Sequence, residues 1–340
     1  MKQQAFVLNQ FFPESLMDEI TEIRLSTPEV IETEAQRRRR RSKLTRDGRL
    51  VLVAVDHPAR GVTKIRGDEY AMGDRWQLLG RARRVLTDPN LDGVLGSVDV
   101  LEELLILSHI ERHTTGRSFL DDRVLLGSMN RGGLSGAVFE MDDMFTGMSA
   151  ERMVELGCDG GKMLYRLDLQ DPASGRTLRA CAQAINALRR NKLAAFVEPL
   201  AVSKKGSGYD TAKDFGSLVR LCGIASALGD SSGHVWLKLP YCEDFERVCR
   251  ATTLPILLLG GPARESPVDT LRDFAQGLAA GARVRGAIIG RNLLYPGKDD
   301  PLPMCRALSK LVHEACGVDE ALRALEESEV QEIPTLHSTL

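Results

Sequence analysis

The sequence predicts a (β/α)8 TIM barrel, a closed ring of parallel strands surrounded by helices, with a helical N-terminal extension. Short apolar runs, typical of strands buried on both faces, alternate with helical patterns through most of the 340 residues. Eight such strand-then-helix units follow one another without a break. A doubly wound sheet would more usually have about five or six strands and a G-x-G-x-x-G turn after the first. The chain has no such turn.

Each expected strand is a β-rich apolar run that ends at a polar residue or a glycine. The strands are predicted at residues 50–55, 91–95, 124–126, 160–167, 194–200, 234–240, 255–259 and 286–289. Their helices are predicted at residues 76–86, 101–110, 149–156, 176–189, 211–228, 243–251, 268–280 and 302–313. The third strand leads into a long glycine-rich segment, SMNRGG at residues 128–133, before its helix begins.

The two ends of the chain differ from this alternation. Residues 1–49 hold an apolar patch at residues 6–12 and two predicted helices, the second of which runs into five arginines at residues 37–41. We expect the arginines to form a solvated helix end, where cations suit the helix dipole. Residues 317–340 predict a charged helix and a polar tail. The expected parts are a helical extension (1–49), the barrel (50–316) and a C-terminal helix with its tail (317–340).

The composition excludes several classes of function. Lys plus Arg number 45 and Asp plus Glu number 47, so no global field attracts nucleic acid or an anionic membrane. The seven cysteines form no C-x-x-C pair, and the six histidines show no HxH or HExxH spacing. We therefore expect no disulfide framework, no metal and no other cofactor. Without an apolar leader or an apolar run of 18 residues, a cytoplasmic protein is expected.

The most informative apolar run is HVWLKLP at residues 234–240, which contains one lysine. Lys238 is flanked by Leu237 and Leu239, so its amine would lie in a dry pocket if the run is a buried strand. Desolvation favours the neutral amine, which is nucleophilic and can form a Schiff base with a carbonyl carbon. For this heptapeptide alone, the alternative is a lysine that snorkels out of a strand end.

Reactive residues are expected at the carboxyl ends of the strands, where barrels of this class have their active sites. The candidates there are Asp56, His57, Lys162, Tyr165, Glu198, Lys238, Gly260, Gly261, Gly290 and Arg291. Buried charges are costly unless paired, so several acids and lysines at one rim favour a functional site. Taken singly, Asp56 could cap a loop, Tyr165 could belong to the core, and Glu198 and Lys162 could simply pair across neighbouring strands.

Glycines after the seventh and eighth strands predict a phosphate site. Backbone N–H groups at Gly260, Gly261 and Gly290 can approach an anion closely, and Arg291 adds a guanidinium at the start of a short helix. TIM barrels commonly hold phosphate at this position. A phosphate beside an imine-forming lysine is typical of a lyase that acts on sugar phosphates.

Six motifs also carry a resemblance to a known superfamily. They are VAVDH (53–57), GCDGGKMLY (157–165), FVEPL (196–200), WLKLP (236–240), PILLLGGP (255–262) and GAIIGRN (286–292). In this order they resemble motifs of the class I aldolases of the deoxyribose-phosphate, tagatose-bisphosphate and archaeal-type fructose-bisphosphate aldolase superfamily. The similarity covers about residues 50–315. The pair Lys162 and Glu198 is most similar to tagatose-bisphosphate aldolase, and the chain also resembles a barrel family associated with actinobacterial inositol-catabolism clusters.

The resemblance implies a role for each matched residue. Lys238 would form the Schiff base, Glu198 would act as general acid or base, and Asp56 would orient or protonate substrate hydroxyls. Lys162 would hold a hydroxyl or carboxylate and lower the pKa of Lys238 by like-charge proximity. The phosphate would bind at Gly260, Gly261, Gly290 and Arg291, with His57 and Tyr165 as further substrate contacts.

The implied reaction is the reversible cleavage of a phosphorylated keto-sugar or keto-acid, and the inositol association suggests 5-dehydro-2-deoxygluconate 6-phosphate. Two alternatives stay open. One is a Schiff-base enzyme that transfers an acyl or ketol group to an acceptor. The other is a non-catalytic barrel that binds a partner through its arginine segment. We also expect a homo-oligomer, with the apolar patch at residues 6–12 as a contact.

Overall fold

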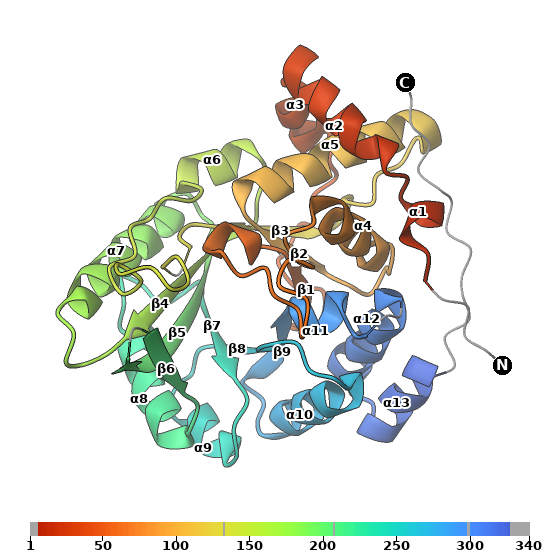
Figure 1. Cartoon of the computed structure of the whole chain (residues 1–340). Helices are drawn as coiled ribbons and strands as arrows, with labels where there is room; N and C mark the ends of the chain where they lie inside the picture. The colour runs from red at the N-terminus through yellow and green to blue at the C-terminus, as the bar shows by residue number, and fades with distance from the viewer. Residues whose placement is uncertain (1–5, 132, 207, 298–299, 327–340) are drawn as a thin grey trace.

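The chain forms a closed ring of parallel strands. The computed structural model describes residues 6–131, 133–206, 208–297 and 300–326. Within these ranges the parallel strands follow the order β1-β2-β3-β4-β5-β7-β8-β9, and β9 pairs with β1 to close the ring (Figure 1). The strands are β1 (Leu50–Ala54), β2 (Gly93–Gly96), β3 (Val124–Ser128), β4 (Gly160–Leu167), β5 (Ala194–Lys205), β7 (Val235–Pro240), β8 (Ile256–Leu259) and β9 (Val284–Ile289). The predicted (β/α)8 barrel is confirmed.

Helices return the chain from each strand to the next along the outside of the ring (Figure 1). They are α4 (Arg75–Leu86), α5 (Val98–Thr115), α6 (Ala150–Glu155), α7 (Ala173–Arg190), α8 (Phe215–Ser226), α9 (Phe245–Arg250), α10 (Pro267–Ala279) and α12 (Pro301–Ser309). Two short helices, η1 (Pro58–Arg60) and α11 (Arg291–Leu294), follow β1 and β9, and η2 (Lys310–Glu314) and α13 (Val318–Glu326) follow α12. None of the described helices is long and apolar enough to cross a membrane. The predicted polar tail at residues 327–340 lies outside the described residues.

Alternate residues of each strand point into the barrel, because successive side chains of a strand leave opposite faces. The inner face holds an apolar cluster that includes Leu52, Leu126, Phe196 and Ile288. Residues of the other parity, such as Val53, pack outward against the helices. The inward-facing residues of β1 and β5 continue, at the carboxyl ends of the strands, to Asp56 and Glu198. The apolar interior therefore ends in a charged layer at the carboxyl end of the barrel.

The fifth strand extends beyond the barrel into a hairpin. Residues 201–205 of β5 pair antiparallel with β6 (Gly208–Ala212), as when Ala201 faces Ala212. Residues 211 and 212 were predicted to begin a helix, but they belong to this strand, and α8 begins at Phe215 behind an Asp214 cap. The prediction was wrong because strand pairing overrides a weak helical pattern. Val202 of the hairpin packs with Met141 and Ala173 in a small apolar cluster beside the barrel mouth.

The N-terminal extension consists of α1 (Leu8–Phe11), α2 (Ser15–Ser26) and α3 (Val30–Arg37), which lie along α4 and α5 (Figure 1). Phe12 is fully buried, and its carbonyl accepts a hydrogen bond of 2.9 Å from the indole Nε1 of Trp76. Leu8 lies over Gly80, where an added Cβ would come within 2.7 Å of its side chain. Most of the apolar patch therefore covers α4 of the same chain, and the buried part of it is not available as a contact between subunits.

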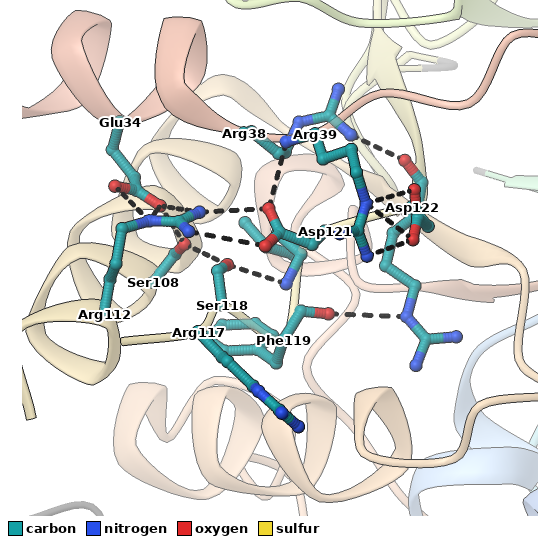
Figure 2. A network of polar contacts seen from close by, with 12 residues as sticks. Glu34, Arg38, Arg39, Ser108, Arg112, Arg117, Ser118, Phe119, Asp121 and Asp122 are labelled. Carbon is teal, nitrogen blue, oxygen red and sulfur yellow. Dashed lines mark hydrogen bonds and ion pairs between the residues drawn. The ribbon is translucent and has the colours of Figure 1, made fainter. Parts of the chain in front are cut away.

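The arginine run crosses the amino-terminal end of the barrel. Arg38 is only 3% exposed, and it donates hydrogen bonds of 2.7 Å to the carbonyl of Arg123 and 2.6 Å to the carbonyl of Gly157. Figure 2 shows Arg38 and Arg39 beside Asp121 and Asp122. The neighbouring arginines of the run form the ion pairs Arg39–Asp122, Arg40–Asp159 and Arg41–Asp92.

These partners lie just before β2, β3 and β4, so the run straps the starts of three neighbouring strands. The predicted solvated helix end is correct for Arg37, which ends α3 and is exposed, and wrong for Arg38 and Arg41, whose buried side chains find carbonyls and carboxylates that are distant in sequence. Glu34 of α3 adds to this anchorage: it is fully buried and pairs with Arg112 of α5 at 3.0 Å (Figure 2). Arg38 and Arg41 are therefore not available to bind a partner, whereas Arg37, Arg39 and Arg40 are exposed.

Replacing Arg38 by methionine is expected to lower the free energy of unfolding by about 3 kcal/mol, because two buried carbonyls lose hydrogen bonds from a charged donor. The matched control is Arg39→Met, since the Arg39 side chain is 70% exposed and its ion pair with Asp122 is solvated. That variant is expected to lose much less stability, because exposed ion pairs contribute little. Urea unfolding of both variants makes the comparison, and equal losses would contradict the buried role of Arg38.

A histidine near the same end of the barrel makes the stability depend on pH. His313 Nδ1 lies 2.8 Å from Asp47 Oδ2, and its Nε2 lies 3.1 Å from Asp92 Oδ2. Burial acts to lower the pKa of His313, but hydrogen bonds to Asp92 and Asp47 outweigh burial and raise it above 6.5.

A raised folded-state pKa stabilises the fold below the unfolded-state pKa, and this stabilisation is lost as the pH rises through the folded-state pKa. His313→Asn should therefore destabilise the protein by on the order of 1 kcal/mol at pH 6 and by less at pH 9. Thermal unfolding at both pH values tests this, and a deficit that grows with pH would refute it.

Candidate active site

Four charged side chains form a continuous chain of ion pairs at the carboxyl end of the barrel. Lys238 Nζ lies 3.0 Å from Glu198 Oε2, and the same oxygen lies 3.0 Å from Lys162 Nζ. Lys162 Nζ in turn lies 3.1 Å from Asp56 Oδ2. All four residues are buried, with exposed fractions of 0 to 6%. The structure therefore brings together Lys238, Glu198, Lys162 and Asp56, from β7, β5, β4 and the end of β1.

Polar side chains from the end of β3 support this layer. Ser128 Oγ lies 3.4 Å from Asp56 Oδ2 and donates a hydrogen bond of 2.9 Å to the carbonyl of Asn130. The Asn130 amide accepts from the N–H of Leu164 at 2.9 Å and donates to its carbonyl at 2.5 Å. Asn130 thus extends the β3–β4 pairing past Lys162, which keeps the upper part of β4 in register. Sequence reasoning did not assign Ser128 or Asn130 to the site.

The surroundings of Lys238 favour its neutral form. Burial lowers the pKa of Lys238 below 10.5, the attraction of Glu198 opposes this shift, and the charge of Lys162 adds to it. A larger fraction of the amine is therefore unprotonated at a given pH than for a lysine in water. This is the direction that attack on a carbonyl carbon requires.

The two carboxylates of the layer stay ionised despite their burial. Burial acts to raise the pKa of Glu198 and that of Asp56, but the ammonium of Lys162 leads the charges that lower both pKa values below the ordinary range. Each carboxylate can therefore accept a proton at neutral pH, and Glu198 is in hydrogen-bond reach of the Lys238 amine.

His57 lies next to Asp56 as a neutral imidazole. Burial lowers the pKa of His57 to about 3 although the charge of Asp56 opposes the shift. Its Nδ1 lies 3.8 Å from Asp56 Oδ1. The ring packs against Gly290, where an added Cβ would come within 2.3 Å of His57 Cε1, so a larger residue at position 290 would displace the ring.

The loops after β8 and β9 are tied together around Arg291. Asn292 donates to the carbonyl of Gly260 at 2.7 Å and to that of Pro262 at 2.8 Å, which fixes the loop that carries Gly261. Gly261 has a φ of +67°, a left-handed conformation that favours glycine. Burial lowers the pKa of Arg291 to about 10, and its Nε has no hydrogen-bond partner among the described residues. A largely buried guanidinium without such a partner is suited to bind an anion.

A cavity of about 300 Å³ lies beside this loop, between the ends of β7 and β8 and helix α10. Pro240, Tyr241, Gly261 and Phe274 are among its lining residues, whereas the four charged residues of the buried layer are not.

Tyr165 is the one candidate that the structure places elsewhere. It is fully buried in the apolar layer between the barrel and the helices, and its neighbours include Cys181 of α7 and Cys222 of α8. Because it stands three residues after Lys162 on one strand, it points to the opposite face. We therefore leave Tyr165 out of the candidate site.

Comparison with known proteins identifies the family. Residues 48–307 match the Cgl0159-like family. The chain belongs to this family. Its solved relative Cgl0159 from Corynebacterium glutamicum is 36% identical, with coverage of 89% of this chain and 98% of the relative and a TM-score of 0.82.

Two further similarities of the Cgl0159-like chain are to proteins named as aldolases. An uncharacterised aldolase of Saccharolobus solfataricus is 33% identical over 132 residues, which are 38% of this chain and 45% of the relative. The match therefore spans less than half of the relative's length. A Schiff-base-forming fructose-1,6-bisphosphate aldolase is 20% identical, with coverage of 83% and 100% and a TM-score of 0.56, which shows a shared fold.

Two arginines that sequence reasoning missed also reach the barrel mouth of this Cgl0159-like chain. Arg166 stands four residues after Lys162 on β4, so strand parity places it on the same inward face. Arg60 ends the short helix η1 after β1. The charge of Arg60 acts to lower the pKa of Glu198, and the charge of Glu198 acts to raise the pKa of Arg166. The parity of β4 could have revealed Arg166, whereas no local pattern marks Arg60.

Metal-ligating side chains are not grouped at the mouth. Across the described ranges, no set of three or more His, Cys, Asp or Glu side chains is arranged to hold a metal ion. The acids at the mouth instead face lysine and arginine side chains.

Proposed function

We propose that this Cgl0159-like protein is a class I aldolase that cleaves a phosphorylated keto-sugar or keto-acid through a Schiff base on Lys238. The observation that carries the proposal is the position of Glu198 Oε2, 3.0 Å from both Lys238 Nζ and Lys162 Nζ in a buried layer. A buried amine beside an ionised carboxylate has the nucleophile and the proton acceptor that imine formation needs.

Glu198 is the proposed proton carrier of imine formation. The neutral amine of Lys238 attacks the ketone carbon, and Glu198 transfers one proton from the attacking nitrogen to the carbonyl oxygen, which becomes the hydroxyl of a carbinolamine. Glu198 then relays a second proton, taken from solvent, to this hydroxyl, which leaves as water while the nitrogen keeps its remaining hydrogen in the iminium. Lys162 keeps Glu198 ionised before the attack, because its ammonium lowers the pKa of that carboxyl.

Asp56 is the proposed base for the bond cleavage. Asp56 takes the proton of the substrate hydroxyl on the carbon at the far side of the bond to be cleaved. The C–C bond then breaks, an aldehyde is released, and the bonding electrons move toward the iminium nitrogen to form an enamine. Protonation of the enamine and hydrolysis of the imine then release the ketone. Ser128 and Lys162 hold the carboxylate of Asp56 in place. His57 is the proposed neutral hydrogen-bonding partner for a substrate hydroxyl.

The phosphate of the substrate is proposed to bind at Gly260, Gly261, Gly290 and Arg291. The unpartnered Nε of Arg291 and the left-handed turn at Gly261 support this site. A phosphate held here places the adjacent ketone carbon toward the ring of strands that carries Lys238.

The substrate we propose is 5-dehydro-2-deoxygluconate 6-phosphate, which would yield dihydroxyacetone phosphate and malonate semialdehyde. It carries a ketone next to a phosphate, as the proposed lysine and phosphate site require. Turnover of this compound should be compared with that of fructose 1,6-bisphosphate and tagatose 1,6-bisphosphate. No cleavage of the first compound would remove it as the substrate.

Borohydride trapping tests the aldolase proposal itself. Dihydroxyacetone phosphate and borohydride should add the mass of a reduced adduct to a peptide that contains Lys238, and Lys238→Ala should abolish this label. Lys204→Ala is the matched control, because Lys204 is exposed on the hairpin that extends β5 beyond the barrel. Labelling that persists in the Lys238 variant, or that disappears in the control, would refute the assignment.

A further inference from the structure

Three arginines at the barrel mouth each have a buried N–H without a hydrogen-bond partner in the part of the chain that the structure describes. Among the described residues, no hydrogen-bond partner exists for Arg60 Nε, Arg166 Nη1 or Arg291 Nε. Buried polar groups are nearly always hydrogen-bonded, and an unsatisfied cationic donor is especially costly. Arg291 is accounted for by the proposed phosphate site. Arg60 and Arg166 are not.

Arg166 and Arg291 lie on opposite sides of the ring. Arg166 belongs to β4 and Arg291 follows β9, and these two strands are separated by three strands along either direction of the closed ring. Lys238 on β7 lies on the arc between them, next to β5. A ligand that reaches from Arg291 to Arg166 must therefore cross the mouth above the lysine.

Arg166 already has an acidic partner from the long segment between β3 and α6. Glu140 Oε1 lies 2.7 Å from Arg166 Nη2, and both side chains are nearly buried. Glu140 comes from residues 129–149, between β3 and α6, and its other oxygen accepts a hydrogen bond of 3.1 Å from the N–H of Gly136. Glu140 thus pairs with Nη2 of the Arg166 guanidinium and leaves Nη1 without a partner among the described residues.

The segment is fastened on both sides of Glu140. Asn130 donates a hydrogen bond of 2.6 Å to Asp143, and Thr177 of α7 donates one of 2.7 Å to the carbonyl of Met141. The N–H of Ser135 donates to the carbonyl of Arg60 at 3.0 Å. The carboxylate of Glu140 can therefore leave Arg166 by a side-chain rotation while the segment stays attached.

We propose that Arg166, assisted by Arg60, binds a second anionic group of the substrate after that group displaces the carboxylate of Glu140. A guanidinium fork matches the oxygen spacing of a carboxylate or phosphate. The inference rests on the proposed function and narrows it to substrates with an anionic group at each end of the carbon chain. Glu140 serves as the resident counter-ion of Arg166 when no such substrate is bound.

Equilibrium binding to protein that carries Lys238→Met tests the proposal, since that substitution prevents cleavage of the ligands. The single-anion probe is fructose 1-phosphate. The two-anion probes are fructose 1,6-bisphosphate, with a second phosphate, and 5-dehydro-2-deoxygluconate 6-phosphate, with a carboxylate. Calorimetry should show that at least one two-anion probe binds at least about tenfold more tightly than fructose 1-phosphate. The probe with the larger gain identifies the second group.

Adding Arg166→Gln should remove most of this preference and change the Kd of fructose 1-phosphate less than about twofold. Adding Glu140→Gln should tighten the two-anion probe, because no carboxylate has to be displaced. Arg176→Gln is the matched control: Arg176 pairs at 2.8 Å with Asp142 of the same segment, but its side chain is 62% exposed. This control should keep the preference, and thermal unfolding should show that every variant is folded.

Equal affinity for one-anion and two-anion probes, absence of binding, or equal effects of Arg166→Gln and Arg176→Gln would overturn the proposal. The aldolase proposal fails separately. If borohydride leaves Lys238 unlabelled in the protein that retains this lysine while the Arg166-dependent preference persists, the anion subsite stands and the Schiff-base function does not.

Discussion

Lys238→Met is expected to lower kcat/KM for aldol cleavage by roughly 10⁴-fold to 10⁶-fold, the loss seen when a covalent nucleophile is removed. Methionine fills a similar volume, and Glu198 keeps its ion pair with Lys162 at 3.0 Å, so the fold should be retained. Steady-state kinetics together with circular dichroism test this prediction. A loss below about tenfold in a folded variant would show that another group is the nucleophile.

The pH profile gives a second measurement for the same residue. Because the amine must be neutral to attack, kcat/KM of the unmodified protein should rise with pH through the pKa of Lys238. Burial lowers this pKa below 10.5, so the rising limb should lie below that value. A limb at or above 10.5 would contradict the dry environment of the amine.

Lys162→Met is expected to destabilise the fold by about 3–5 kcal/mol, in addition to its effect on catalysis, because it breaks a buried ion-pair network. Lys162 is fully buried and is the cation that Asp56 and Glu198 share. Without it, Asp56 loses its nearest cation, and Glu198 keeps its ion pair with Lys238 and the more distant charge of Arg60. The matched control Lys213→Met removes an exposed lysine and should change stability by less than about 0.5 kcal/mol.

The sign of the pH dependence distinguishes this mechanism from simple loss of packing. In the unmodified protein the pKa values of Asp56 and Glu198 are lowered, so both carboxylates stabilise the fold above their unfolded-state pKa values, and this stabilisation is lost as the pH falls. In Lys162→Met the two carboxylates should titrate at higher pH and become neutral on mild acidification. Urea unfolding should therefore show a smaller deficit at pH 5 than at pH 7.5. A constant deficit would point to packing alone.

The sequence was a good guide to the barrel because the main signal is local. Each buried parallel strand is a short apolar run, and all of the predicted strands appear at or close to their predicted positions. The β5–β6 hairpin was missed because its strands are largely exposed, and the residues that pack Val202 come from two other segments. Long-range partners of this kind leave no periodic signal in either segment.

The candidate site was predictable to the extent that strand parity defines a face. Lys162 and Arg166 are four residues apart on β4 and share the inward face, whereas Tyr165 has the other parity and lies in the outer core. Counting alternate residues from Lys162 along β4 would have put Arg166 among the candidate site residues in place of Tyr165. Glu140 and Arg60 could not be assigned in this way, because their positions depend on how two irregular segments fold.

The arginine strap at the other end of the barrel has a consequence for the order of folding during synthesis. Arg38 hydrogen-bonds to the carbonyls of Arg123 and Gly157, which lie 85 and 119 positions further along the chain. The N-terminal helices leave the ribosome first, but their buried anchors do not exist until the starts of β3 and β4 have been made. Contacts of such separation form late and slowly. The apolar face around Phe12 can pack on α4 as soon as the first barrel unit has been made, whereas the arginine strap closes only after β3 and β4 have begun.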